Sequence, residues 1–162
     1  VSRRKTIENY KARLVTIFEN SKFIHKLSLG MFGNTVCPHS MKINTSKRTH
    51  IQRAYGEVIV KGGTDEIPDM EELSKVLDAS FSSPTFSILK TEDEAYIVDK
   101  MWKNPLFVED VARNILYLTQ KTFNDKKIEI EAYVESFESI HKHNVISRGS
   151  TFTSAYKKSY ST

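Results

Sequence analysis

The sequence predicts an α+β fold in which an antiparallel sheet carries its helices on one face. Three segments in the first 63 residues alternate apolar and polar side chains with a period of two, which is typical of half-buried strands. Segments with helical spacing are gathered between positions 69 and 118, and a period of two returns after position 127. This segregation favours an antiparallel sheet, because a doubly wound parallel sheet would need strands and helices to alternate.

The first two strands are predicted at 11–19 and 22–32, joined by a hairpin turn at Glu-Asn-Ser-Lys, 19–22. Each places alternate side chains on one face. These are Ala12, Leu14, Thr16 and Phe18 in the first, and Phe23, Leu27, Leu29 and Met31 in the second. A third strand at 53–63 has Val58 and Val60 on one face and stops at two glycines.

Three helices are predicted in the middle of the chain. Asp69 with Glu72 marks the start of the first, Thr91 with Glu94 the start of the second, and Asn104-Pro105 the start of the third. Apolar residues follow each start at helical spacing. They are Met70, Leu73, Val76, Leu77 and Phe81, then Ala95, Val98, Met101 and Trp102, then Phe107, Val111, Ile115 and Leu118.

A further strand is predicted in KIEIEAYVESFESI (127–140), and a polar strand or tail follows at 144–158. Alternate residues of this strand are apolar and define a buried face. They are Ile128, Ile130, Ala132 and Val134.

The composition is that of a single globular domain: 162 residues, 39% hydrophobic and 27% charged. No run approaches the ~20 apolar residues that cross a bilayer, so no membrane association is expected. The start, VSRRKTIENYKARL, has no apolar region of a signal peptide and no initiator methionine, so we expect a fragment or a processed product. A single cysteine excludes an internal disulfide and favours the cytoplasm. The net charge of +4 favours polyanionic partners, either nucleic acid or a nucleotide phosphate.

Cys37-Pro38-His39, with His50 further along the same polar loop, is the first candidate for chemistry. A thiolate and an imidazole suit zinc or iron. The alternative is a buried free cysteine beside surface histidines, because this spacing of cysteine and histidine is not a standard metal motif.

Three carboxylates also stand at unusual places. Glu94 either completes a capping box or faces a metal, and Glu109 either complements a helix dipole or points into a cleft. Glu138 falls on the predicted buried face, where an unpaired carboxylate is costly, and His141 and His143 follow it. These three form either an acid–base relay or a strand-end carboxylate with two solvent-exposed histidines.

Three blocks of sequence resemble, in order and spacing, the type IB GTP cyclohydrolases. The blocks are TVCPHS…THIQRAYGEVIV, TEDEAYIVDKMWKNPLFVEDVARNI and IEIEAYVESFESIHKHN. The resemblance runs from the start of the chain to about Arg148 and is to the C-terminal half of that family. Its archaeal branch starts tetrahydromethanopterin synthesis, and its bacterial branch starts folate synthesis.

The resemblance implies a tunnelling fold (T-fold), with residues 1–162 as one module of a longer two-module chain. It implies a homo-oligomer around a central tunnel, with active sites near subunit interfaces. The implied reaction is metal-dependent hydrolytic opening of the guanine imidazole ring of GTP, which releases formate and leaves a dihydroneopterin phosphate. Whether this product is the triphosphate or a cyclic phosphate stays open.

The resemblance also implies roles for individual residues. A divalent metal, Fe(II), Zn or Mn, would be held by Cys37, His50 and Glu94. Glu109 would anchor the guanine, since a carboxylate accepts from the ring N–H and the exocyclic amine together. Proton transfer would fall to Glu138, His141 and His143. The triphosphate would meet Lys47, Arg48 and Arg53.

The sequence departs from the family in two ways. The bacterial pattern Cys-Pro-Cys-Ser is Cys-Pro-His-Ser here, so His39 either replaces the second thiol as a proton donor or competes as a metal ligand. This favours the archaeal branch. The N-terminal module of the family is also not found in this sequence, which would leave an exposed sheet edge.

Three alternative functions remain from the sequence: another T-fold enzyme acting on a purine or pterin, a nucleic-acid-binding domain, and a non-catalytic scaffold. The nucleic-acid alternative rests on the net charge and on four basic residues, Lys42, Lys47, Arg48 and Arg53. Nucleic acid is disfavoured as a partner, because no aromatic residues are interleaved with these bases for stacking.

Overall fold

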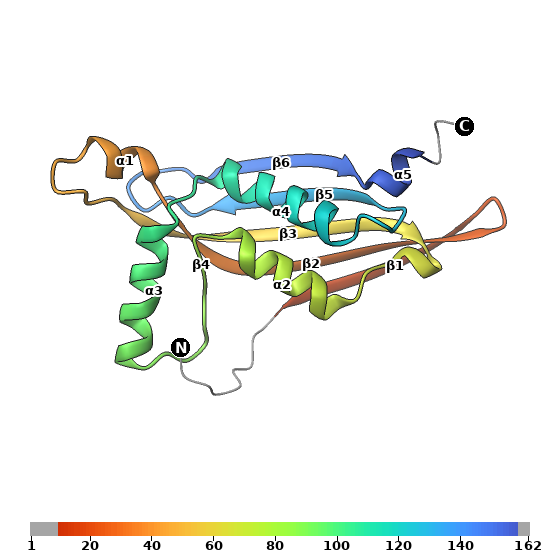
Figure 1. The fold of residues 1–162 in the computed structure, drawn as a ribbon, viewed down its shortest axis with the longest axis horizontal. Helices are drawn as coiled ribbons and strands as arrows, with labels where there is room; N and C mark the ends of the chain where they lie inside the picture. The colour runs from red at the N-terminus through yellow and green to blue at the C-terminus, as the bar shows by residue number, and fades with distance from the viewer. Residues whose placement is uncertain (1–9, 159–162) are drawn as a thin grey trace.

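The chain folds into a six-stranded antiparallel sheet with helices on one face, as a computed structural model that describes residues 10–158 shows (Figure 1). The predicted α+β class and antiparallel sheet are confirmed. The strand order is β1-β2-β3-β5-β6, and β4 pairs with β2 beyond the start of β1. The strands are β1 (Lys11–Glu19), β2 (Lys22–Val36), β3 (Ile51–Gly63), β4 (Ser83–Pro84), β5 (Glu129–Ser136) and β6 (Val145–Phe152).

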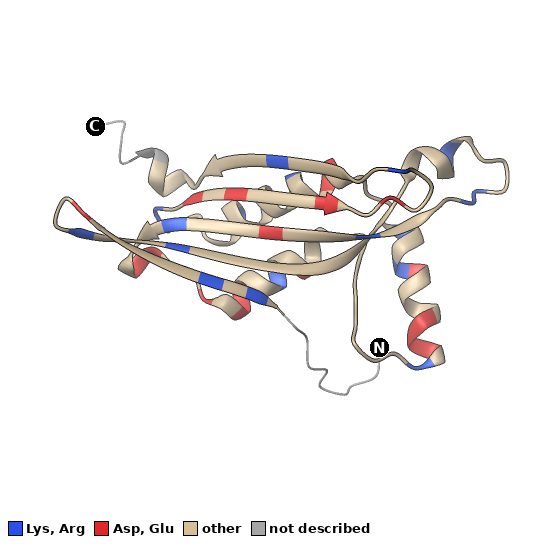
Figure 2. Ribbon diagram, turned by 180° about the vertical axis from the view of Figure 1, so that it is seen from behind, with Lys and Arg blue, Asp and Glu red and all other residues tan. Residues whose placement is uncertain are grey.

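Two helices cover the sheet, and the remaining helices lie at its ends. α2 and α4 pack across β2, β3, β5 and β6, whereas α1 and α3 lie at one end of the sheet. The opposite face carries no helix, and both acidic and basic residues lie along its strands (Figure 2). The helical elements are α1 (Pro38–Ile43), the 3₁₀ turn η1 (Thr64–Glu66), α2 (Met70–Ser80), α3 (Thr91–Lys103), α4 (Val108–Thr122) and α5 (Ser154–Lys158).

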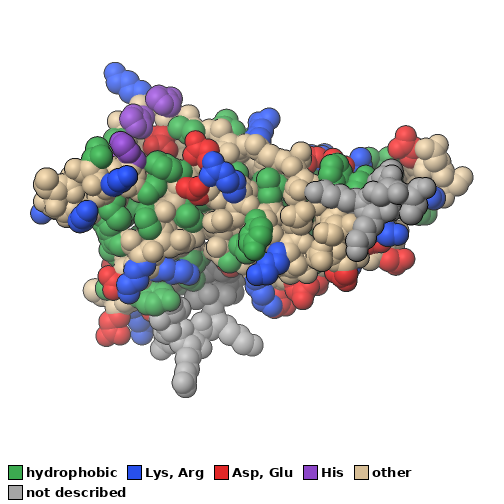
Figure 3. Space-filling view, turned by 45° about the horizontal axis from the view of Figure 1, so that its top comes forward, with side chains coloured by type: hydrophobic (Ala, Val, Ile, Leu, Met, Phe, Trp, Pro, Cys, Tyr) green, Lys and Arg blue, Asp and Glu red, His purple; other side chains and the backbone are tan. Residues whose placement is uncertain are grey.

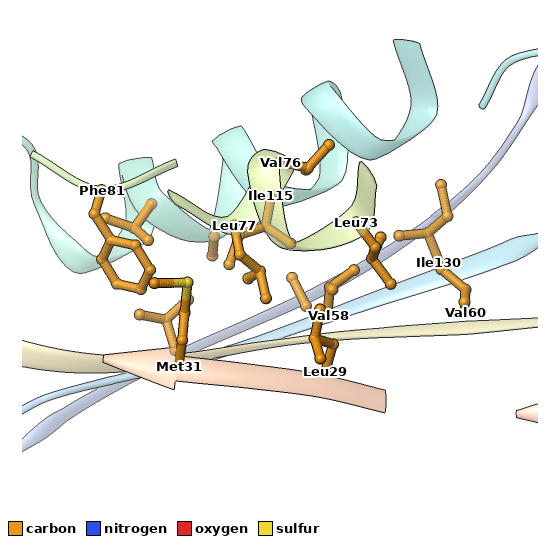
Figure 4. Close-up of a cluster of buried hydrophobic side chains, with 14 of the residues drawn as sticks. Leu29, Met31, Val58, Val60, Leu73, Val76, Leu77, Phe81, Ile115 and Ile130 are labelled. Atoms are coloured by element: carbon orange, nitrogen blue, oxygen red, sulfur yellow. The ribbon is translucent and has the colours of Figure 1, made fainter. Parts of the chain in front are cut away.

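The core lies between the sheet and these two helices, and the predicted alternation of β3 and β5 supplies much of it. Val58, Val60 and Ile130 are fully buried under α2 and α4 (Figure 4). Leu73 and Leu77 of α2 and Ile115 of α4 close the core from the other side. Removing this apolar surface from water is the main favourable contribution to folding.

The prediction that β1 is half-buried is wrong. Leu14 and Phe18, which share the face on which the helices pack, are 61% and 66% exposed. α2 packs on β2, α4 packs on β3, β5 and β6, and β1 lies beyond both helices (Figure 1). The period of two therefore gave the correct face of the strand but carried no information on what covers it.

Two of the three predicted helix starts are correct, since α2 begins after Asp69 and α3 begins at Thr91, and the third is displaced. Asp69 caps α2, because its carboxylate accepts from the backbone N–H groups of Glu71 and Glu72 at 2.8 and 3.1 Å. α3 is capped by Asp93, whose carboxylate accepts from the backbone N–H of Lys90 at 3.4 Å, so the predicted capping role of Glu94 is wrong.

The start of α4 lies three residues later than expected. Asn104 ends α3 instead of opening α4, because its backbone N–H donates to the carbonyl of Met101. α4 begins at Val108, where the carboxylate of Asp110 accepts from the backbone N–H of Phe107 at 3.1 Å. The Asn-Pro pair therefore belongs to the connection between the two helices.

Phe81 follows α2 and lies flat on the sheet, where two glycines leave room for its ring. A Cβ added to Gly33 would lie 2.2 Å from Cγ of Phe81, and one added to Gly56 would lie 2.7 Å from Cζ. The ring is 2% exposed and lies beside Met31 (Figure 4). This close approach fixes the last turn of α2 to β2 and β3.

Two ion pairs cross the uncovered face of the sheet. Lys26 pairs with Glu131 at 3.6 Å and Lys61 with Glu129 at 3.9 Å, all four side chains being substantially exposed. In these two pairs, acidic residues of β5 lie opposite basic residues of β2 and β3. Among the described residues, no helix combines the length and apolar character needed to cross a bilayer.

Candidate active site

Cys37 lies where β2 ends and α1 begins, in a segment predicted to be a loop throughout. It is the residue before the helix, and its Sγ accepts from the backbone N–H of Ser40 at 3.3 Å. Its own N–H donates to the carbonyl of His50 at 3.4 Å, which sets His50 opposite Cys37 where β3 begins. The thiol is half-buried, so the alternative of a fully buried cysteine does not hold.

A chain of side-chain hydrogen bonds connects His50 to Glu138. Nδ1 of His50 lies 3.0 Å from Oε1 of Gln52, and Nε2 of Gln52 donates to Oε1 of Glu138 at 3.5 Å. The hydroxyl of Ser136 donates to the same carboxylate oxygen at 2.7 Å. Glu138 lies two residues beyond the end of β5 and is half-buried, so its predicted place within the strand, on the buried face, is wrong.

The partners of Glu138 differ from one of the two alternatives that the sequence left open, that of a carboxylate held by backbone amides. Its carboxylate accepts hydrogen bonds from two side chains, those of Ser136 and Gln52, and not from backbone amides. Ser136 is 1% exposed and lies 3.5 Å from the hydroxyl of Thr35 on β2. The site is therefore anchored in the buried end of the sheet.

His141 and His143 join this group from the loop between β5 and β6. Their rings stack with centroids 5.4 Å apart, and the ring of His141 meets that of His50 edge-on at 6.5 Å. Histidines gather at this end of the molecule (Figure 3). The three imidazoles and Glu138 thus come from two distant stretches of sequence to one surface.

Glu94 does not join Cys37 and His50. It lies in the first turn of α3, and its exposed side chain has no hydrogen bond or ion pair within residues 10–158. No three histidine, cysteine or acidic side chains of the described part of the chain come close enough together to hold a metal ion. Of the three predicted ligands, Cys37 and His50 are joined by a backbone hydrogen bond.

Glu109 lies at the same end of the sheet, exposed in the first turn of α4. The backbone N–H of Val36 donates to the carbonyl of Leu106 at 3.3 Å, which ties the approach to α4 to the residue before Cys37. A carboxylate at the positive end of a helix dipole is favoured in its charged form. Glu109 is thus an accessible acceptor near the histidine cluster.

The predicted phosphate ligands are divided between two places. Lys47 and Arg48 are exposed in the loop between α1 and β3, and His39 is exposed in the first turn of α1. The guanidinium of Arg53 lies over the ring of Phe32, 4.8 Å from its centroid, beside a hollow of about 410 Å³ formed by β2, β4 and the loop after it. Because side chains alternate along β3, Arg53 and Gln52 point to opposite faces of the sheet.

Gln52 and Ser136 are the members of this group that sequence reasoning missed. Both are uncharged, and neither breaks the apolar pattern in a way that indicates chemistry. The only available signal was the motif His-x-Gln-Arg, in which the glutamine falls two residues after a candidate ligand and so on the same face.

Comparison with known proteins places the whole chain, not individual residues. A family model described as type I GTP cyclohydrolase folE2 matches residues 1–147. The chain belongs to this family. The match includes the candidate residues of the three blocks, from Cys37 to His143.

Individual relatives extend the comparison. The chain is 45% identical over 145 residues to the GTP cyclohydrolase MptA of Pyrococcus abyssi. The aligned segment covers 90% of this chain and 53% of that protein. It is 43% identical over 146 residues to the MptA of Pyrococcus furiosus, with the same two shares. With the GTP cyclohydrolase FolE2 of Thermotoga petrophila the identity is 37% over 127 residues, 78% of this chain and 47% of that protein. The chain therefore spans about half the length of the curated relatives it matches.

Proposed function

We propose that the protein acts as a GTP cyclohydrolase, which opens the imidazole ring of guanine by hydrolysis and releases C8 as formate, for the synthesis of folate or methanopterin. Family membership supports this activity. The single observation that carries it is the hydrogen-bonded group of His50, Gln52, Ser136 and Glu138 with His141 and His143 beside it. It combines a carboxylate with imidazoles, the side chains that proteins most often use for general acid–base catalysis.

Glu109 is proposed to bind the guanine. Its carboxylate can accept from the ring N–H and from the exocyclic amine at once, a two-point contact that adenine cannot reproduce. It is exposed and unpaired among the described residues, and it lies at the end of the sheet where the histidines gather. Lys47 and Arg48, exposed near His50, are the cations proposed for the triphosphate; Arg53 lies on the other sheet face and fits this role less well.

A divalent metal is proposed between Cys37 and His50. A thiolate and an imidazole can bind Fe(II), Zn or Mn, and the thiolate suits Fe(II) and Zn better than Mn. When bound, such an ion lowers the pKa of a water molecule and so supplies hydroxide near neutral pH. Glu94 is the third proposed ligand, and because it is exposed and unpaired on α3, nothing within residues 10–158 holds it in another role.

Glu138, His141 and His143 are proposed to move protons. The carboxylate of Glu138, held by Ser136 and Gln52, can accept a proton from the attacking water. The two stacked histidines lie at the surface, where they can donate protons to the ring nitrogen that must leave. His39, exposed on α1, is a further candidate donor.

The T-fold oligomer remains part of this proposal. Two features support it: a sheet face without helices and the unpaired outer edges of β1 and β6 in the described chain (Figure 2). Edges of this kind are usually covered or paired in native proteins. A second module or a second copy of the chain would cover them.

The test is the release of formate from GTP with Fe(II), Zn or Mn. We expect Glu138→Gln to abolish it, whereas Glu131→Gln, the same change on the uncovered face of the sheet, should leave it within twofold. Phosphate analysis of the product distinguishes the triphosphate from the cyclic phosphate. GTP that is bound but yields no formate with any of the three metals would favour another purine- or pterin-directed enzyme.

A further inference from the structure

Gln52 occupies the centre of the hydrogen-bonded group, and the group's geometry fixes which way its amide points. A carboxamide has one oxygen that accepts and one nitrogen that donates. Glu138 also receives the hydroxyl of Ser136 on the oxygen that faces Gln52, at 2.7 Å. An ionised carboxylate only accepts, so the amide nitrogen of Gln52 must face it, and the amide oxygen must face His50.

We infer that Gln52 is a positioning residue whose amide orientation sets the tautomer of His50. Because Oε1 of Gln52 accepts, Nδ1 of His50 must carry the proton in the 3.0 Å contact between them. The lone pair of the neutral imidazole is then on Nε2, which is free to bind a cation or accept a proton. The same amide restrains Glu138 from the other side.

The buried end of β5 makes this arrangement rigid. Ser136 is 1% exposed and forms the second donor to Glu138, while Thr35 lies 3.5 Å from its hydroxyl. A carboxylate with two donors on one oxygen cannot rotate without losing both contacts. The orientation of Gln52, and with it the tautomer of His50, is thus imposed from the sheet.

The inference deepens the proposed function but does not wholly rest on it. The tautomer of His50 is a property of the free chain and can be measured without metal or GTP. Its consequence for catalysis, that Gln52 aligns a metal ligand and a proton acceptor, does rest on the proposed function. Outer partners of this kind typically change activity or metal affinity by about 10–100-fold.

The test of the tautomer is long-range ¹H–¹⁵N correlation NMR on the metal-free chain at a pH where His50 is neutral. We expect protonated Nδ1 in the wild type and in Gln52→Glu, which retains an acceptor for His50. Gln52→Leu should shift the majority to protonated Nε2, the form that an unrestrained histidine favours. Gln120→Leu is the matched control, because it removes an amide that donates to the carbonyl of Phe152 at 2.7 Å and lies away from His50.

Turnover separates the two contacts of Gln52. Gln52→Glu keeps the contact to His50 but sets a second carboxylate against Glu138, so kcat should fall about 10–100-fold with little change in KM. Ser136→Ala should reduce kcat in the same way, and Ser136→Thr, which keeps the hydroxyl, should restore it. A structural role alone would move stability without this split between kcat and KM.

These experiments test the role of Gln52 separately from the proposed GTP cyclohydrolase activity. Protonated Nε2 in the wild type, or unchanged protonated Nδ1 in folded Gln52→Leu, would overturn the inference even if the chain released formate. A wild-type chain with protonated Nδ1 that releases no formate would support the inference and contradict the proposed function.

Discussion

Gly33→Ala should destabilise the protein through one contact. The added Cβ would lie 2.2, 2.5 and 2.6 Å from three ring carbons of Phe81. Since carbon atoms approach no closer than about 3.5 Å at the energy minimum, the ring must retreat by roughly 1 Å. Phe81 is 2% exposed and has no space to do so. Overpacking of this kind typically costs about 1–3 kcal/mol.

The backbone does not add to this cost. No described glycine has a positive φ, so alanine fits the conformation of Gly33 without strain. Gly63→Ala is the matched control, because a Cβ there would meet only Cγ of Glu66, at 3.9 Å. We expect this control to change the free energy of unfolding by less than about 0.5 kcal/mol.

The assay is urea unfolding followed by circular dichroism, with the midpoint and the slope compared between variants. Combining Gly33→Ala with Phe81→Leu should cost less than the sum of the single changes, with a coupling of about 0.5–3 kcal/mol, since the smaller side chain makes room. Additive costs, or a Gly33→Ala variant as stable as the wild type, would refute the assignment of the cost to this contact.

Two further variants test buried polar groups. Tyr55 has a buried hydroxyl with no hydrogen-bond partner among the described residues. Tyr55→Phe should therefore raise the free energy of unfolding by up to about 1 kcal/mol. A lower free energy of unfolding, measured by urea unfolding, would contradict this. Burial raises the pKa of Asp78, against the lowering effects of the Tyr10 hydroxyl and the Lys100 charge. A carboxyl whose pKa is higher in the folded than in the unfolded state stabilises the folded protein at pH values below its unfolded pKa. This stabilisation is lost as the pH rises through the folded pKa. Asp78→Asn should therefore gain stability relative to the wild type between about pH 3 and pH 7, and a constant difference would count against the burial effect.

The fold class and much of the core could be predicted because both depend on periodicity. Val58, Val60 and Ile130 alternate with polar residues and are fully buried, as a sheet covered on one face requires. The same periodicity could not show that Leu14 is exposed, because what covers a strand depends on where helices far along the chain pack. A period of two identifies one face of a strand, whereas the burial of that face depends on which helices pack against it.

Helix starts were predictable where one residue had the capping role to itself. Asp69 had no competitor and was placed correctly. In TEDE three acids follow the threonine, and the structure uses Asp93 and not Glu94 as the capping carboxylate. The start of α4 is displaced because Asn104 can end one helix as readily as begin the next.

The candidate site was predictable as a set of chemically unusual residues but not as an arrangement. The ends of β3 and β5 bring His50 and Glu138 together through the strand register, which no local pattern specifies. Gln52 and Ser136 connect them and carry no sequence signal of their own. Glu94 lies apart from Cys37 and His50 in the described chain, and its predicted role stays a prediction.

The most direct measurement follows C8 of the substrate. The chain is incubated with GTP carrying ¹³C at C8 and with Fe(II), Zn or Mn, and the label is observed by NMR. The proposed function predicts that the label leaves the purine and appears as formate, and that Glu138→Gln prevents this. Label that stays in the guanine ring with all three metals would contradict it.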